Sequence, residues 1–99
     1  MKSLEAQNFA DQFGSNLAYC RRRAGISQEE LAVLASVHRT EISHLERGLR
    51  IARVDTVVKL AGSLGIAPGE LLDGLGWEPG SALIGKFVGG GREPRDATG

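Results

Sequence analysis

The stretch SQEELAVLASVHRTEISHLERG, from Ser27 to Gly48, decides the fold because it holds two short helical patterns that are only a few residues apart. Ser27 and Glu30 form a capping box, which gives the free amides at a helix start a hydroxyl and a carboxylate partner. Gly48 ends the second pattern, since glycine readily adopts the left-handed conformation of a helix end. We therefore predict helices over 28–35 and 39–47, with the second folded back on the first.

The turn between these two helices contains Ser36 and Val37. Glycine would suit this turn better, so we expect Ser36 to adopt a strained backbone conformation that costs about 1 kcal/mol. In the helix over 28–35 we expect Leu31, Leu34 and Ala35 to face inward. Two short helices joined by a tight turn match the helix-turn-helix pattern, whose second helix can enter the DNA major groove.

The helix over 39–47 has one apolar and one polar side. Ile42 and Leu45 are predicted to face the core together with Val37. The opposite side then carries hydrogen-bond donors that can reach base edges or phosphates, namely Arg39, Thr40, Ser43, His44 and Arg47. A merely solvated polar face is the alternative interpretation.

The net charge of the 99-residue chain is zero, but the charges are unevenly distributed. Residues 21–53 hold seven Arg against four Glu, whereas residues 54–80 hold one Lys against two Asp and two Glu. A basic segment that coincides with the helix-turn-helix pattern favours a DNA-binding protein. Charges mixed over a solvated surface are the alternative.

Several other classes of protein are disfavoured. No apolar run reaches the roughly 18 residues of a membrane span and the N-terminus is too polar for a signal peptide, so we expect a cytoplasmic protein. A single cysteine, Cys20, excludes an internal disulfide and a Cys-based zinc cluster, and we expect it to be buried. No paired carboxylates, nucleophile-base set or phosphate loop is present, so we expect neither an enzyme nor a metal or cofactor.

The rest of the chain divides into a helical part over 9–74 and a tail over 75–99. The spacing of Phe9, Phe13, Leu17, Cys20 and Ala24 predicts a first helix that ends at Gly25. A fourth helix is predicted from Val54 to Leu64, and Pro68 begins a short fifth helix. The tail is rich in glycine, which predicts flexibility, particularly from Gly89 onward. Its hydrophobic residues must either fold back on the helices or bury against a second subunit, and these are Trp77, Leu83, Ile84, Phe87 and Val88.

Phe13 to Gly74 resembles the lambda-repressor-like, Cro/C1-type helix-turn-helix domain, also called the XRE family. The resemblance is carried by LAYCRRRAGISQEELA at 17–32, VHRTEISHLERG at 37–48 and LAGSLGIAPGELL at 60–72. It implies an all-α, five-helix bundle that regulates transcription by binding a near-palindromic operator in double-stranded DNA as a homodimer. The chain is also similar to controller proteins of restriction-modification systems, small phage repressors and antitoxins.

The resemblance also implies residue roles. Base contacts fall at Arg39, Thr40 and His44, with Ser43 as a further candidate, and backbone contacts fall at Gln28, Arg47, Arg50 and Arg53. Arg21 and Glu46 fall where the family often has a structural salt bridge between the first and third helices.

The hydrophobic residues left over once the bundle closes predict a dimer interface at Leu72, Leu75 and Trp77. Two alternatives remain open for this segment. Trp77 can instead cap the core of its own subunit, or the C-terminal segment can bind another protein, as in an antitoxin-like interaction module.

Overall fold

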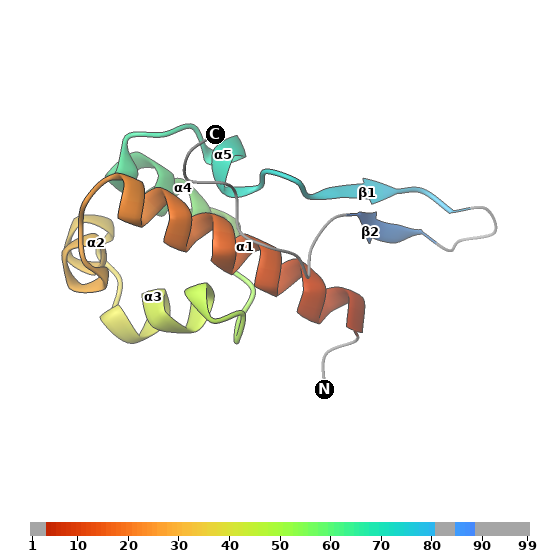
Figure 1. Cartoon of the computed structure of the whole chain (residues 1–99), viewed down its shortest axis with the longest axis horizontal. Helices are drawn as coiled ribbons and strands as arrows, with labels where there is room; N and C mark the ends of the chain where they lie inside the picture. Colours follow the sequence, from red (N-terminus) through yellow and green to blue (C-terminus); the bar gives the residue numbers. More distant parts are fainter. Residues whose placement is uncertain (1–3, 81–84, 89–99) are drawn as a thin grey trace.

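The computed structural model describes residues 4–80 and 85–88. It contains five helices followed by a small antiparallel sheet (Figure 1). The elements are α1 (Leu4–Arg23), α2 (Gln28–Ala35), α3 (Arg39–Glu46), α4 (Val54–Leu64), α5 (Pro68–Leu71), β1 (Gly76–Glu78) and β2 (Lys86–Val88). The first helix thus begins earlier than the predicted Phe9, and none of the described helices combines the length and apolarity that crossing a membrane requires.

The start of α2 and the turn that follows it have the local structure predicted from the sequence. Ser27 Oγ accepts from the Glu30 amide at 3.0 Å, and the Ser27 amide donates to Glu30 Oε1 at 2.8 Å. At the other end of α2, Ser36 adopts the left-handed conformation, with φ 56° and ψ 44°. The expectation of a strained serine in the turn is therefore confirmed.

Side chains from all five helices meet in one core. The fully buried large residues are Leu17, Leu31, Ile42, Leu45, Leu60 and Leu71, together with the polar Asn16. α1 contacts α3 and α5, while α2 packs against both α3 and α4. The third helix is therefore braced by α1 and by α2, which fixes its orientation in the bundle.

One inward-facing residue of α2 was predicted wrongly. Leu34 is 59% exposed, whereas Ala32 is buried together with Leu31 and Ala35. Because α2 packs between α3 and α4, its buried side is centred on positions 31, 32 and 35, and this centre turns Leu34 toward solvent. Helical spacing alone does not set this rotation in a helix of only eight residues.

The helix α1 holds the helices α3 and α5 at close range. At Gly14 the backbones of α1 and α3 are so close that an added Cβ would overlap the carbonyl oxygens of Leu45 and Glu46. Two residues further along, the buried Asn16 side chain donates to the carbonyl oxygens of Leu71 at 3.0 Å and Asp73 at 2.8 Å. These contacts fix the ends of α3 and α5 against the longest helix.

The fold is not strictly all-α, because part of the predicted tail forms a β-hairpin that extends beyond the bundle (Figure 1). In its register Gly76 pairs with Val88, Trp77 with Phe87 and Glu78 with Lys86. Phe87 lies between two aromatic rings, with ring centroids 5.0 Å from Trp77 and 4.8 Å from Phe9 on α1. The hairpin therefore folds back in part on α1, while Leu83, Ile84 and the stretch from Gly89 onward lie outside the described residues.

Candidate DNA-binding surface

The third helix has a fully buried side and a solvent-facing side. Ile42 and Leu45 have no exposed surface. On the opposite side Arg39, Thr40 and Arg47 are exposed, and Ser43 and His44 are partly exposed. Within the described part of the chain, the side chains of Arg39 and Arg47 form no hydrogen bond or ion pair. Their guanidinium donors therefore remain available to a ligand outside the protein.

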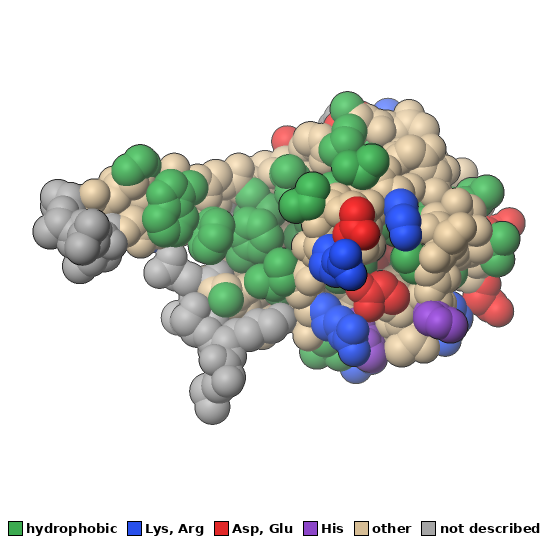
Figure 2. All heavy atoms as spheres, turned by 180° about the vertical axis from the view of Figure 1, so that it is seen from behind, with side chains coloured by type: hydrophobic (Ala, Val, Ile, Leu, Met, Phe, Trp, Pro, Cys, Tyr) green, Lys and Arg blue, Asp and Glu red, His purple; other side chains and the backbone are tan. Residues whose placement is uncertain are grey.

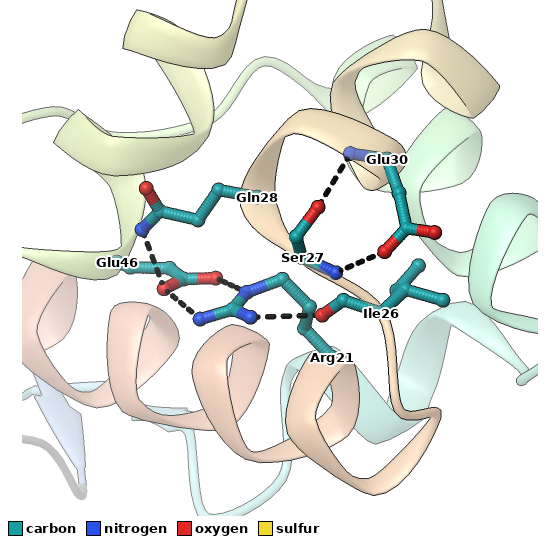
Figure 3. Close-up of polar contacts among 6 residues, drawn as sticks. All are labelled: Arg21, Ile26, Ser27, Gln28, Glu30 and Glu46. Atoms are coloured by element: carbon teal, nitrogen blue, oxygen red, sulfur yellow. Dashed lines mark hydrogen bonds and ion pairs between the residues drawn. The ribbon is translucent and has the colours of Figure 1, made fainter.

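Arg21 on α1 and Glu46 at the end of α3 form the ion pair that the family resemblance implied (Figure 3). Arg21 Nε and Nη2 donate to the two carboxylate oxygens at 2.6 and 3.0 Å, and Nη1 donates to the Ile26 carbonyl at 2.9 Å. The hydrogen bonds to Glu46 raise the pKa of Arg21, although burial acts in the opposite direction. Because both side chains are largely buried, this bidentate pair connects α1, α3 and the start of α2.

Gln28, at the first position of α2, also contacts this ion pair. Its amide nitrogen donates to Glu46 Oε1 at 3.0 Å (Figure 3). A side-chain amide carries two N–H donors, so this bond leaves the second one for another acceptor. The predicted phosphate-binding residue is thus oriented by a contact to α3 that sequence reasoning did not anticipate.

Each of the two arginines predicted to contact the DNA backbone from the loop after α3 has an acidic partner. Arg50 Nη1 lies 3.4 Å from Glu41 Oε1, and Arg53 Nε lies 3.3 Å from Asp55 Oδ1. The Arg50 and Arg53 side chains are 59% and 84% exposed. Sequence reasoning missed both acidic partners. The proximity of Asp55 to Arg53 in the sequence was a usable signal, whereas the contact between α3 and Arg50 spans nine residues and depends on the loop path.

A shallow depression of about 390 Å³ lies beside α3. It is lined by His38, Thr40, Glu41, His44 and Arg50. It therefore brings together two predicted base-contacting residues and one predicted backbone-contacting residue. Figure 2 shows basic, acidic and histidine side chains gathered on the bundle part of the molecule, away from the hairpin.

The three residues predicted for a dimer interface lie in different surroundings. Leu72 is 41% exposed, Trp77 is 54% exposed on the hairpin, and Leu75 packs against the core. Leu72 also lines an apolar groove of about 280 Å³. The groove lies between α1, α4, α5 and the loop that connects α3 to α4. The other residues lining this groove are Phe9, Ala10, Phe13, Ile51, Ala52, Val54, Val57, Val58 and Pro68. Figure 2 shows hydrophobic side chains along the hairpin and the adjoining part of the bundle.

Cys20 is buried, as predicted. Among residues 4–80 and 85–88, no three His, Cys, Asp or Glu side chains gather in an arrangement that would hold a metal ion.

Comparison with known proteins finds a control protein and an HTH-type transcriptional regulator among the relatives of this chain. Control protein C.BamHI of Bacillus amyloliquefaciens is 40% identical over 62 residues, which cover 62% of this chain and 76% of that protein. An uncharacterized HTH-type transcriptional regulator of Sinorhizobium fredii, y4dJ, is 41% identical over 59 residues, covering 60% of this chain and 77% of that protein.

A similar fold is found in a solved structure of a controller protein. The restriction-modification controller protein C.AhdI of Aeromonas hydrophila superposes with a TM-score of 0.62 at 39% identity, covering 63% of this chain and 94% of that chain. The helix-turn-helix family model HTH_3 matches residues 17–71, which include all of α2, α3 and α4. With the motifs at 17–32 and 37–48 and the two-sided α3 described above, the chain belongs to the HTH_3 helix-turn-helix family, of XRE type.

Proposed function

We propose that this protein is a sequence-specific transcriptional regulator that binds a near-palindromic operator as a homodimer through α3. The observation that carries this proposal is the two-sided α3: Ile42 and Leu45 anchor it in the core, while Arg39 and Thr40 are exposed on the other side. A rigid helix that presents unpaired donors is suited to reading base edges in the major groove. We also propose that the protein is not an enzyme and that it acts in the cytoplasm.

In this proposal Arg39 makes the most discriminating base contact. A guanidinium can donate two hydrogen bonds to O6 and N7 of guanine, and such a bidentate contact contributes about 1–3 kcal/mol of discrimination against other bases. Thr40, Ser43 and His44 supply further contacts from the same side of the helix, and they have fewer donors than an arginine.

The surrounding residues position the protein on the DNA backbone. Gln28, Arg47, Arg50 and Arg53 are assigned to phosphate, since they flank α3 at the start of α2, the end of α3 and the following loop. Contacts of this kind make affinity dependent on salt, with each neutralised phosphate contributing about 0.9 to the slope of log affinity against log salt concentration.

For the homodimer, the apolar groove around Leu72 supports an interface that extends beyond the predicted residues. Val54 is 81% exposed, Val58 55% and Ile51 49%, and all three line this groove. Exposed apolar residues that adjoin one another favour association with another protein surface. In a twofold dimer of this kind, the two α3 helices would contact half-sites about 34 Å apart, the usual spacing for dimeric helix-turn-helix proteins.

Selection of bound duplexes from a random pool tests the DNA-binding proposal, because it yields the sequence, symmetry and spacing of the site together. On the selected site, Arg39→Ala should relax preference at one base-pair position in each half-site. Arg47→Ala should weaken cognate and random DNA by similar factors, since it is assigned to the backbone. If Arg39→Ala also loses affinity by similar factors on cognate and random DNA, its assignment to a base contact is wrong.

Sedimentation velocity tests the interface. Val54→Asp places a charge on the groove, so we expect the variant to sediment as a monomer at concentrations at which the unchanged protein is a dimer. Trp77→Ala examines the hairpin separately. If Val54→Asp leaves the dimer intact and Trp77→Ala dissociates it, the hairpin rather than the groove holds the two subunits together.

A second candidate function is a protein-interaction module that uses the hairpin. Trp77 and Phe87 favour it, because they are 54% and 43% exposed and lie opposite each other in the hairpin. Trp77→Ala would then abolish copurification with a partner protein and leave DNA binding unchanged. If Trp77→Ala loses both DNA binding and dimerisation, the first proposal is favoured instead.

A further inference from the structure

The four arginines on the proposed DNA-binding surface divide into two classes. Within the described residues, Arg39 on α3 and Arg47, which directly follows α3, have no side-chain hydrogen-bond or ion-pair partner. Arg50, from the following loop, is paired with Glu41 of α3, and Arg53, at the start of α4, is paired with Asp55. A carboxylate therefore occupies a position beside a predicted phosphate-binding arginine, where an approaching DNA phosphate would also need to bind.

Glu41 is at the third position of α3, as Glu30 is in α2. Glu30 turns back and accepts a hydrogen bond from the amide of its N-cap residue. Glu41 instead points to the loop and accepts from Arg50 at 3.4 Å, and the N-cap residue of α3, His38, makes no side-chain cap. The Glu41 carboxylate is thus directed toward the loop arginine rather than used to cap its own helix.

The location of this pair brings it into competition with DNA. Glu41 and Arg50 line the same depression as Thr40 and His44, which are assigned to base contacts. The Glu41 side chain is 26% exposed and the Arg50 side chain is 59% exposed, so both are accessible from the depression. A phosphate that approaches Arg50 meets the negative charge of Glu41 within a few ångströms, and at this distance salt screens the repulsion only partly.

We propose that Glu41 is an autoinhibitory partner of Arg50: its carboxylate competes with DNA phosphate for the guanidinium and so weakens binding to DNA of every sequence. This inference rests on the proposed DNA-binding function and adds a determinant of its affinity. The base contacts of Arg39 and Thr40 do not depend on Arg50. Glu41 therefore limits the sequence-independent part of the binding energy.

The test measures the affinity of the full chain for a random-sequence duplex by fluorescence anisotropy at several salt concentrations. Glu41→Gln should bind about 2- to 5-fold tighter than the unchanged protein at low salt, the range that corresponds to an exposed ion pair. The gain should shrink as salt rises, because both the pair and the phosphate contact are screened.

Glu78→Gln is the matched control. Glu78 also forms an exposed ion pair, with Lys86 at 3.8 Å, but on the hairpin and away from α3. The control changes the net charge by the same amount and should leave affinity within about 1.5-fold of the unchanged protein. An equal gain in both variants would show a general charge effect and would overturn the proposal.

Combining Glu41→Gln with Arg50→Gln separates competition from simple repulsion. If Glu41 acts by holding Arg50, the factor by which Glu41→Gln raises the affinity for DNA should be at least twofold smaller in the Arg50→Gln variant than in the unchanged protein. An undiminished effect in the Arg50→Gln background, or no gain from Glu41→Gln alone, overturns the proposal while leaving the DNA-binding function intact. If the unchanged protein binds neither selected nor random duplexes, both the proposed function and this inference are overturned.

Discussion

Replacing Gly14 with alanine should displace α3, because α1 and α3 are in backbone contact at this residue. The added Cβ would lie within 3.0 Å of three backbone atoms, namely the carbonyl oxygen of Leu45 and the carbonyl oxygen and carbon of Glu46. Backbone atoms cannot rotate away as the end of a flexible side chain can. The separation from the Glu46 oxygen would be 2.7 Å, so this contact alone requires a movement of about 0.7 Å to reach ordinary contact near 3.4 Å, and the Leu45 oxygen, which would be closer still, requires more.

Two opposing effects set the size of the change in stability. Overpacking of this kind typically costs about 1–3 kcal/mol. Alanine recovers roughly 0.5–1 kcal/mol, because glycine in a helix interior loses more backbone entropy on folding. Because the added Cβ would meet three backbone atoms, we expect an overpacking cost at the upper end, about 2–3 kcal/mol. Gly14→Ala should therefore lower the free energy of unfolding by about 1–2.5 kcal/mol, which corresponds to a decrease in Tm of roughly 4–20 °C for a domain of this size.

Thermal unfolding followed by circular dichroism measures this effect, with Gly62→Ala as the matched control. Gly62 is in α4, and a Cβ added there meets no atom within 4 Å, so this variant should gain about 0.5–1 kcal/mol. The two glycine-to-alanine changes should thus shift Tm in opposite directions. If Gly14→Ala melts at or above the temperature of the unchanged protein, α1 and α3 are not in backbone contact at this residue, and the proposed placement of α3 is wrong.

Two further predictions concern the turn and the ion pair. Ser36→Gly should raise the free energy of unfolding by about 0.5–1 kcal/mol, because glycine adopts the observed φ of 56° without strain; an unchanged or lower urea midpoint would contradict this. Glu46→Ala should cost about 2–4 kcal/mol, since it leaves the largely buried Arg21 guanidinium without its carboxylate. Adding Arg21→Ala to Glu46→Ala should then cost much less than Arg21→Ala alone, and strictly additive losses in urea unfolding would show that the pair is not coupled.

The features that the sequence predicted correctly depend on neighbouring residues in the chain. Ser27 and Glu30 satisfy each other's amides within one helical turn, and they do so in the structure. Ser36 is left-handed at the C-terminal end of α2, where its amide donates to the carbonyl oxygens of Ala32 and Val33 within the same turn. The apolar spacing in α3 likewise indicated which residues are buried, and Ile42 and Leu45 are.

The predictions that failed, and the contacts that were missed, depend on how the helices are arranged. Leu34 fits the apolar pattern of α2, yet α3 and α4 cover a different side of that helix. The hairpin was predicted as part of a flexible tail, because strands of three residues within a glycine-rich stretch carry little local signal. The pairing of Glu41 with Arg50 depends on the path of the loop after α3.

The sequence by itself determined the bounds of α2 and α4, which side of α3 is apolar and to which family the chain belongs, because capping, turn chemistry and periodicity act over three or four residues. Only the tertiary structure decided how closely α1 approaches α3 at Gly14, which residues surround the apolar groove at Leu72, and that Glu41 of α3 is paired with Arg50 of the following loop. Contacts of this second kind join segments that are distant in the chain, and their geometry exists only once the helices have packed.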